Sequence, residues 1–192
     1  MPKEILFDEQ VALQQAMELF WTKGYNGTSM DELTKATGLS RSSIYNTFGG
    51  KHALFMRCLQ FYLDDQTRQL SALAGREPNV KVRIRMAFEF AIEEILSDRM
   101  RKGCLMVNTT TEMANQDAEI AAVAVSNMND MERLFGAWVE EGQSAGQVRS
   151  VFPPSVLARH LFNLYSGLKV SGKTKPDRAT LEDIVKAGLS VL

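Results

Sequence analysis

The chain has 192 residues, 45% of them hydrophobic, which is enough for one large core or for a small domain joined to a larger one. Its 22 basic and 23 acidic residues give a net charge of −1, so the overall charge does not indicate a nucleic-acid partner. No apolar run approaches the roughly 20 residues that span a bilayer, and no charged and then apolar leader is seen, so we expect a cytoplasmic protein.

Apolar residues recur at intervals of three and four along the chain, and patterns typical of strands are almost absent. This spacing predicts an all-α fold of about nine helices. Glycine and proline residues mark most of the breaks between them. The helices are expected at residues 8–23, 28–37, 40–48, 51–73, 79–96, 104–114, 117–145, 154–171 and 177–191.

The second and third of these helices are short and are joined by a glycine turn. Ser29 and Glu32 have the spacing of a capping box, which satisfies backbone N–H groups at the start of a helix. Gly38 stands where the first helix of the pair must stop, because a residue without a side chain enters the left-handed region at little cost. Two helices joined in this way are typical of a helix-turn-helix DNA-binding motif.

The second helix of this pair, at residues 40–48, has an apolar side and a polar side. Ile44 and Phe48 are four positions apart and are expected to face inward. The other side carries short hydrogen-bonding groups and no large acid, as a helix needs if it is to lie inside the major groove of DNA. An ordinary helical hairpin with a solvated polar side is the alternative. The residues expected on the outward side are Arg41, Ser42, Tyr45 and Asn46.

The motifs around this helix pair agree in spacing and residue type with one known family. They are Ala16-Met17-Glu18-Leu19-Phe20, Lys23-Gly24-Tyr25, Thr28-Ser29-Met30, Ala36-Thr37-Gly38-Leu39-Ser40, Ile44-Tyr45-Asn46-Thr47-Phe48 and Lys51-His52-Ala53-Leu54. In these motifs the chain resembles the tetracycline-repressor (TetR) family of bacterial transcription regulators. The resemblance implies a helix-turn-helix DNA-binding domain at residues 1–52 and an effector-binding and dimerisation domain at residues 53–192. It also implies a homodimeric repressor that a small molecule releases from a palindromic operator in double-stranded DNA.

The resemblance also implies which residues contact DNA. Arg41 is suited to pair with guanine and Asn46 with adenine. Asn46 stands where many members have an aromatic residue or histidine, so the operator need not resemble those of relatives. Residues 1–60 hold six cations and six anions, so we expect few ionic phosphate contacts and a weak salt dependence. Phosphates are expected at Thr28, Ser40, Tyr45 and Lys51, and base edges at Arg41, Ser42, Ser43 and Asn46.

The second half of the chain is expected to bind the effector. Methionine is frequent between residues 100 and 131, and its flexible side chain suits an adaptable apolar pocket, although ordinary core packing is the simpler interpretation. In the resembled family the middle helices enclose such a pocket, so we expect a small, largely apolar or aromatic compound. The residues expected to bind it are Phe88, Ile92, Cys104, Asn108, Met131, Phe135, Leu164 and Tyr165.

The last two expected helices each carry a leucine-rich apolar stripe. Burial inside one protomer would explain both stripes. In the resembled family, however, these helices pack against those of a second subunit as a four-helix bundle, and paired DNA-binding heads need a twofold partner to read a palindrome. The residues expected at the dimer interface are Leu157, Leu161, Leu168, Leu181, Val185 and Leu189.

Cys104 supports an alternative mode of regulation. It lies at the start of an expected helix, after Arg101 and Lys102, where backbone N–H groups and cations favour a thiolate. A redox-sensing or electrophile-sensing repressor that uses Cys104 is therefore one hypothesis. A small buried hydrophobe is the competing interpretation, since cysteine is often buried.

No catalytic residue, metal or cofactor is expected. His52 and His160 lie in no signature of nucleophilic catalysis, and His160 has no ligand-type neighbour at helical spacing, which indicates an interior or interface histidine. We therefore expect that the chain is not an enzyme. Two alternatives stay open: a helical interaction module without a DNA function, and a DNA-bound activator in place of a repressor.

Overall fold

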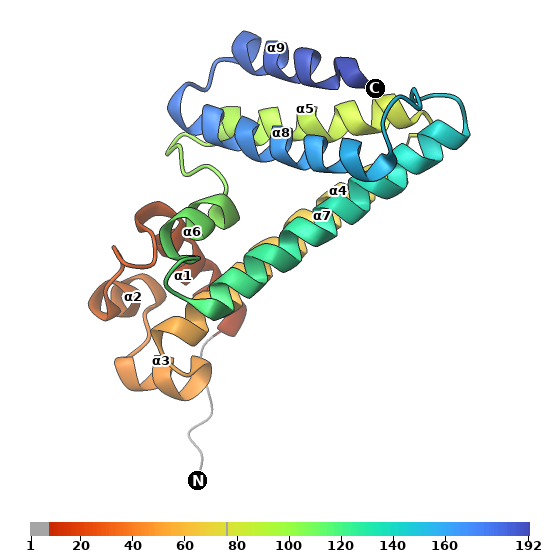
Figure 1. The fold of residues 1–192 in the computed structure, drawn as a ribbon. Helices are drawn as coiled ribbons and strands as arrows, with labels where there is room; N and C mark the ends of the chain where they lie inside the picture. Colours follow the sequence, from red (N-terminus) through yellow and green to blue (C-terminus); the bar gives the residue numbers. More distant parts are fainter. Residues whose placement is uncertain (1–7, 76) are drawn as a thin grey trace. The chain divides into compact units, whose positions relative to one another are not determined.

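The computed structural model describes residues 8–75 and 77–192 (Figure 1). These residues contain nine α-helices and one short 3-10 helix, and they contain no strand. The all-α prediction is confirmed, and each expected helix is found. Among the described residues no helix is both long enough and apolar enough to cross a membrane. The helices are α1 (Glu9–Lys23), α2 (Met30–Thr37), α3 (Arg41–Phe48), α4 (Lys51–Ala74), α5 (Val80–Ser97), α6 (Leu105–Met113), α7 (Ala118–Ser144), α8 (Pro154–Thr174), α9 (Arg178–Gly188) and the 3-10 helix η1 (Leu189–Val191).

The helix ends follow from local side-chain chemistry. At the N-termini of six helices a short polar side chain accepts hydrogen bonds from the backbone N–H groups of the first turn. At the other end of α2 and α3 stand Gly38, with φ of 68°, and Gly49, with φ of 88°, both in the left-handed region that glycine adopts readily. The N-capping residues are Asp8, Ser29, Ser40, Asn79, Asp117 and Asp177.

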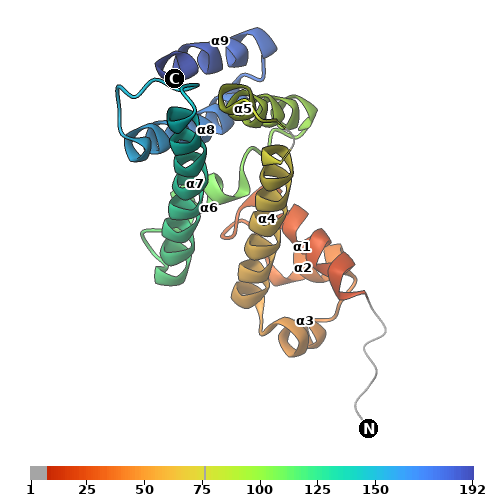
Figure 2. The same ribbon diagram turned by 90° about the vertical axis from the view of Figure 1, so that its right-hand side faces the viewer.

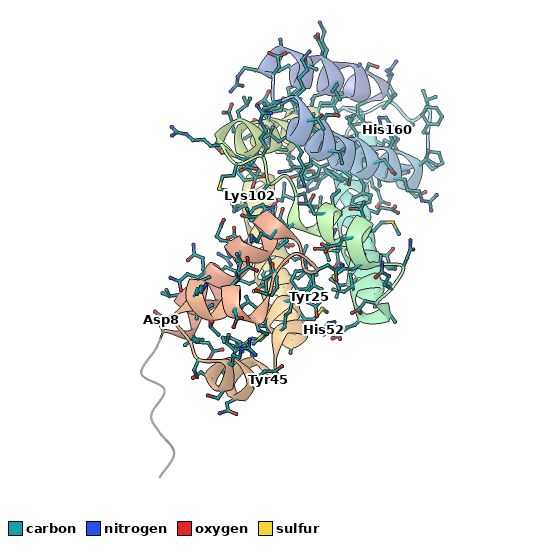
Figure 3. All side chains as sticks on the ribbon, turned by 90° about the vertical axis from the view of Figure 1, so that its left-hand side faces the viewer. Asp8, Tyr25, Tyr45, His52, Lys102 and His160 are labelled. Carbon is teal, nitrogen blue, oxygen red and sulfur yellow. The ribbon has the colours of Figure 1, made fainter. Side chains whose placement is uncertain are left out.

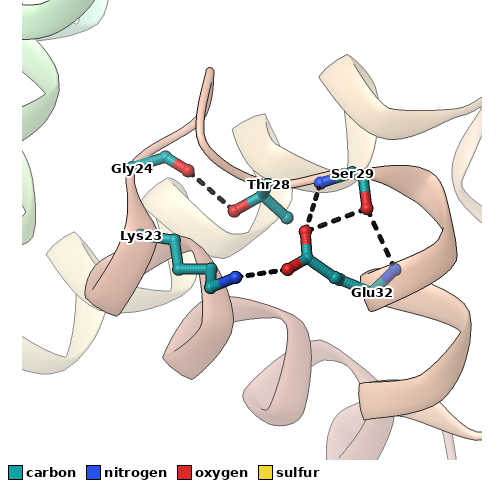
Figure 4. Close-up of polar contacts among 5 residues, drawn as sticks. All are labelled: Lys23, Gly24, Thr28, Ser29 and Glu32. Carbon is teal, nitrogen blue, oxygen red and sulfur yellow. Dashed lines mark hydrogen bonds and ion pairs between the residues drawn. The ribbon is translucent and has the colours of Figure 1, made fainter.

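The expected capping box joins α1 to α2 (Figure 4). The backbone N–H of Glu32 donates to Ser29 Oγ at 3.2 Å, and the backbone N–H of Ser29 donates to Glu32 Oε2 at 2.9 Å. Lys23, in the last turn of α1, donates to the same carboxylate. The hydrogen bond from Lys23, followed by those from Ser29, lowers the pKa of Glu32 from 4.5 to about 2. A single carboxylate thus ties the end of one helix to the start of the next.

The chain divides into two compact units, unit 1 (Met1–Asp65) and unit 2 (Gln66–Leu192), and the division lies inside α4. The boundary that the sequence predicts, between residues 52 and 53, lies at the start of the same helix. Because α4 is one continuous helix, it belongs to both units and no loop separates them. Each unit is described below by itself.

Unit 1 is held together by aromatic rings that come from α1, the α1–α2 loop and α4. The Phe20 ring lies 4.9 Å from that of Phe55 and 6.1 Å from that of Tyr25, measured between ring centroids. Cys58 is fully buried beside them and donates to the Leu13 carbonyl at 3.5 Å. Burial raises the pKa of the Cys58 thiol to about 12, so this cysteine is inert at neutral pH.

In unit 2, α8 packs against α5, α7 and α9 (Figures 1 and 2). Two glycines allow the close approaches in this core. A β-carbon at Gly172 of α8 would lie 2.4 Å from Ile95 Cγ2 of α5, and one at Gly142 of α7 would lie 2.7 Å from Val148 Cγ2. A larger side chain at either position would have to displace these neighbours, because protein interiors have few voids.

The leucine-rich stripes of α8 and α9 lie inside the protomer, which corrects their assignment to a dimer interface. Five of the six residues assigned to the interface are at most 6% exposed, and the sixth, Leu189, is partly buried against the same core. A side chain that is covered by its own protomer has almost no surface left for a second subunit. The competing interpretation of the stripes, burial within one chain, is the one that the structure supports. The residues are Leu157, Leu161, Leu168, Leu181, Val185 and Leu189.

The close contact at Gly172 leads to a stability prediction. Gly172→Ala should lower the free energy of unfolding by about 1–3 kcal/mol, because Ile95 has to move out of a packed core. Gly136→Ala on α7 is the matched control, since its new β-carbon would lie at an ordinary 3.6 Å from Ala158 Cβ. The control should be neutral or slightly stabilising because alanine favours helix more than glycine does. Urea unfolding followed by circular dichroism measures both, and equal stabilities for the two variants would contradict the packing argument.

Candidate functional site

The polar side of α3 faces outward, as the helical periodicity predicts. Ile44 and Phe48 are 0% and 5% exposed, so they anchor the helix in unit 1. Tyr45, on the opposite side, is 58% exposed and lies on α3 in Figure 3. The exposed residues of this face are Arg41, Ser42, Tyr45 and Asn46. They form what we call the reading face, an outward row of hydrogen-bonding groups on one rigid helix.

Three serines at the start of α3 bond to one another. Ser40 Oγ accepts a hydrogen bond from the Ser43 backbone N–H at 3.1 Å, and lies 2.9 Å from Ser42 Oγ and 2.8 Å from Ser43 Oγ. Ser40 and Ser42 are exposed and Ser43 is half-buried. Because hydroxyl hydrogens rotate, the two exposed serines can exchange these bonds for bonds to another group.

Thr28 does not belong to this surface, and its assignment as a phosphate contact is corrected. The residue is 1% exposed, and its hydroxyl donates to the Gly24 carbonyl at 2.7 Å (Figure 4). Thr28 therefore closes the α1–α2 loop from the inside. Sequence position alone did not reveal this, because the loop brings the hydroxyl back to a carbonyl four residues earlier.

Lys51, the first residue of α4, lies against the face of an aromatic ring. Its Nζ is 4.2 Å from the Tyr25 ring centroid, in a cation–π arrangement. The His52 ring lies edge-on to the Tyr25 ring, with 6.1 Å between centroids, and the two residues are labelled in Figure 3. The half-buried ammonium is thus held near the end of α3, where a phosphate contact was expected.

Arg41, the expected guanine contact, has an acidic partner that the sequence analysis missed. Its Nη2 donates to Asp31 Oδ1 of α2 at 2.7 Å. The hydrogen bond and the charge of Asp31 raise the pKa of Arg41. Ten positions separate the two residues and no local pattern links them, so only the folded helix pair reveals the contact.

Unit 2 brings most of the expected effector residues together in its interior. The Phe88, Phe135 and Tyr165 rings lie 5.7–6.3 Å apart between centroids. Ile92 is buried in the same core, and Met131 and Leu164 are packed against it. The frequent methionines do not share one surface, however, because Met100 is 68% exposed whereas Met106 is 3% exposed.

A polar cluster around the buried Lys169 adjoins these rings, and the sequence analysis did not identify it. Lys169 is 5% exposed and donates to Glu94 Oε2 at 2.5 Å, while Gln66 donates to Glu94 Oε1 at 3.0 Å. Lys169 Nζ also lies 5.5 Å from the Tyr165 ring centroid. A lysine on the apolar stripe of α8, four positions after Tyr165, is the signal that could have indicated it.

The Tyr165 hydroxyl is buried and has no hydrogen-bond partner among the residues that the structure describes. Burial, followed by the electrostatic influence of Glu94 and Cys104, raises the pKa of Tyr165 well above its ordinary value. A buried hydroxyl without a partner costs free energy, and such a group in a folded protein calls for an explanation. A bound molecule that accepts a hydrogen bond would supply the missing partner.

Cys104 and Asn108 lie at the start of α6. Asn108 Nδ2 donates to the Lys102 carbonyl at 2.7 Å, and its Oδ1 accepts from Lys173 at 3.1 Å, so its amide braces the preceding loop. Cys104 is half-buried at the N-cap of α6, and its side chain makes no capping hydrogen bond.

His160 bonds within unit 2. Its Nε2 lies 2.8 Å from the Gly188 carbonyl, which agrees with an interior histidine. Among the described residues no group of three or more histidine, cysteine, aspartate or glutamate side chains is arranged to hold a metal ion.

Comparison with known proteins identifies the family. The sequence model described as "Bacterial regulatory proteins, tetR family" matches residues 12–58, and the one described as "Tetracyclin repressor-like, C-terminal domain" matches residues 81–187. The first match contains α2 and α3, and the second contains α6 to α8.

Individual relatives agree with these matches over almost the whole chain. The uncharacterized HTH-type transcriptional regulator YezE of Bacillus subtilis is 28% identical over 97% of this chain and 96% of its own length. The HTH-type transcriptional repressor ComR of Escherichia coli is 28% identical over 94% of this chain and 85% of its own length.

A solved structure agrees as well. A cysteine variant of the TetR family regulator CifR, in complex with 26-bp operator DNA, superposes with a TM-score of 0.88 at 26% identity, covering 97% of this chain and 98% of that one. The matches to both family models, one of which covers more than half of the chain, show that this protein belongs to the TetR family of bacterial transcription regulators and binds DNA as a transcriptional regulator.

Proposed function

We propose that the protein represses transcription from a palindromic operator and leaves the operator when a small, largely apolar molecule binds in unit 2. The observation that carries the proposal is the buried Tyr165 hydroxyl without a partner, beside a ring of aromatic side chains. The relative ComR is named a transcriptional repressor, and the similar CifR structure contains operator DNA, which supports repression by operator binding. The proposed function includes no catalytic step. It places the protein in the cytoplasm, because bacterial DNA is there.

The reading face supplies the DNA contacts in this proposal. Arg41 and Asn46 read base edges, with Ser42 and Ser43 beside them, because guanidinium and amide groups can form paired hydrogen bonds with guanine and adenine. Ser40, Tyr45 and Lys51 hold phosphates. Most of these phosphate contacts are neutral, so they position the protein without strong attraction to every sequence.

The aromatic rings and the polar cluster supply the effector contacts. The apolar part of the effector lies among Phe88, Phe135 and Tyr165, and an acceptor atom on it takes the Tyr165 hydrogen. A neutral acceptor such as a carbonyl oxygen suits the cluster, since Lys169 already has the Glu94 carboxylate as its counter-ion.

Glu94 provides a route from this site to α4. One carboxylate oxygen holds Lys169 on α8 and the other holds Gln66 on α4. An effector that displaces Tyr165 or Lys169 has to disturb Glu94 and, through it, Gln66. The same helix begins at Lys51 directly after α3, so a shift of α4 would move the reading face. A ligand acts in this way only if it binds the two arrangements with different affinity.

The dimer needs a surface other than the buried leucine stripes. Val156 and Val170 are 42% and 51% exposed, and fourteen positions, about four helical turns, separate them. They therefore lie on one side of α8, and the exposed Gly167 between them allows close approach of another helix. We place the twofold contact on this side of α8. Two copies of α3 have to enter successive major grooves about 34 Å apart, and this is why operator binding needs a twofold partner.

The roles of Arg41 and Lys51 can be separated with DNA. On a duplex selected by the wild type from a random pool, Arg41→Ala should lose roughly ten- to a hundredfold in affinity but should lose little on a scrambled duplex. Lys51→Ala should weaken binding to both duplexes alike, because a phosphate contact carries no sequence information. Fluorescence anisotropy titrations give both ratios. Equal losses on the two duplexes for Arg41→Ala would refute the base contact.

The Tyr165 hydroxyl gives a test of the effector site. Without effector, Tyr165→Phe should raise the free energy of unfolding by about 1 kcal/mol, since it removes a buried polar group that has no partner. A compound that raises the wild-type melting temperature in a screen of aromatic aldehydes, ketones and phenols should bind the variant roughly five- to tenfold more weakly. Tyr45→Phe, which removes an exposed hydroxyl in unit 1, should change neither quantity. A loss of stability in Tyr165→Phe would show that the hydroxyl has a structural role.

A charge on the outward side of α8 tests the dimer surface. Val170→Glu should weaken dimerisation at least about tenfold, because twofold symmetry brings two copies of the unpaired carboxylate into the contact. Val82→Glu places the same charge at a valine of α5 that is 42% exposed and should leave the dimer intact. Light scattering after gel filtration distinguishes the 21.5 kDa protomer from the dimer. A dimeric Val170→Glu protein would place the interface elsewhere.

A further inference from the structure

The contact between Asp31 and Arg41 puts a carboxylate beside the reading face. The two side chains are 69% and 62% exposed, and the N–O distance is 2.7 Å. No acid is present in the first turn of α3 itself. The neighbouring Glu32 is already held by Lys23 and by the capping box, so Asp31 is the carboxylate of the first turn of α2 that pairs with Arg41.

This ion pair has little to do with stability. Pairs exposed to this degree contribute almost nothing measurable to folding, because water and salt screen them. Even without Arg41, Asp31 suits the start of α2, where the helix dipole favours a negative charge. Arg41, by contrast, lies at the start of α3, where the dipole disfavours a cation. A cation at that position, held by an acid from another helix, points to a role on the surface that meets DNA.

The chemistry of the guanidinium group defines this role. Asp31 takes a hydrogen bond from one nitrogen, and the group has further N–H donors for guanine O6 and N7. Arg41 can therefore read a base while Asp31 holds it. As a contact to phosphate it is much less useful, since its charge is balanced and Asp31 repels the backbone.

We propose that Asp31 is a positioning residue that determines specificity: it orients the guanidinium of Arg41 toward base edges and prevents its use as a phosphate contact on arbitrary DNA. This inference rests on the proposed base contact of Arg41. It explains how a DNA-binding unit that carries few cations discriminates between sequences. Asp31 suppresses binding to random DNA, and the ordered side chain loses less conformational entropy when it meets its base.

The experiment compares the selected duplex with the scrambled duplex at several salt concentrations. Asp31→Asn should bind the scrambled duplex roughly three- to tenfold more tightly and the selected duplex with little gain, so that the ratio of the two affinities falls. The salt slope on scrambled DNA should steepen by about 0.9, as one more phosphate is neutralised. Asp31→Glu should keep the wild-type ratio in large part because it retains the carboxylate.

Two controls separate this role from a general effect of charge. Asp64→Asn makes the same chemical change at an exposed residue of α4, roughly 20 Å along the helix from Lys51, and should leave the ratio unchanged. In an Arg41→Ala background, Asp31→Asn should no longer alter the ratio. Circular dichroism and melting temperature confirm that each variant is folded.

Each remaining outcome decides against one part of the argument. An unchanged ratio in Asp31→Asn, with a lowered ratio in Arg41→Ala, would overturn the role of Asp31 and leave the base contact of Arg41 intact. An equal gain of Asp31→Asn on both duplexes, with or without Arg41, would mean that Asp31 only repels phosphates. An unchanged ratio in Arg41→Ala would remove the proposed base contact and the inference together.

Discussion

The burial of Ile44 and Phe48 is the constraint on which the DNA-binding unit depends. These two side chains are four positions apart, so they fix the rotation of α3 about its own axis as well as its attachment to unit 1. Once that rotation is fixed, Arg41, Tyr45 and Asn46 have to point outward. The aromatic contacts of Phe20, Tyr25 and Phe55 hold α1, the α1–α2 loop and α4 together in the same unit. Specificity for a base sequence needs the fixed rotation of α3 because base contacts depend on direction.

Unit 1 neutralises part of its own positive charge. Three of its cations are paired with acids, so the unit attracts DNA weakly in general and depends on neutral donors and on direction. A regulator of this kind prefers its operator because its affinity for all other DNA sequences is low. The three pairs are Lys23–Glu32, Arg41–Asp31 and Arg57–Glu9.

Unit 2, in contrast, has charged and polar groups in its interior. A buried lysine and a carboxylate beside a hydroxyl without a partner are expensive compared with an apolar core of the same shape. In the proposed function they are the groups that an arriving ligand rearranges, since each has few alternatives inside the protein. Because Glu94 also holds Gln66 of α4, the proposed rearrangement would act on a helix that begins just after α3.

The sequence by itself determined the helices and the orientation of α3, because caps, glycine stops and apolar periodicity act over a few neighbouring residues. The caps at Ser29 and Ser40 and the stop at Gly38 are found as expected. Only the tertiary structure decided which polar groups meet. It buried Thr28 and the leucine stripes of α8 and α9, and it joined Asp31 to Arg41 and Glu94 to Lys169. The physical reason is that periodicity shows which side of a helix is apolar, whereas the packing of distant segments decides what covers it.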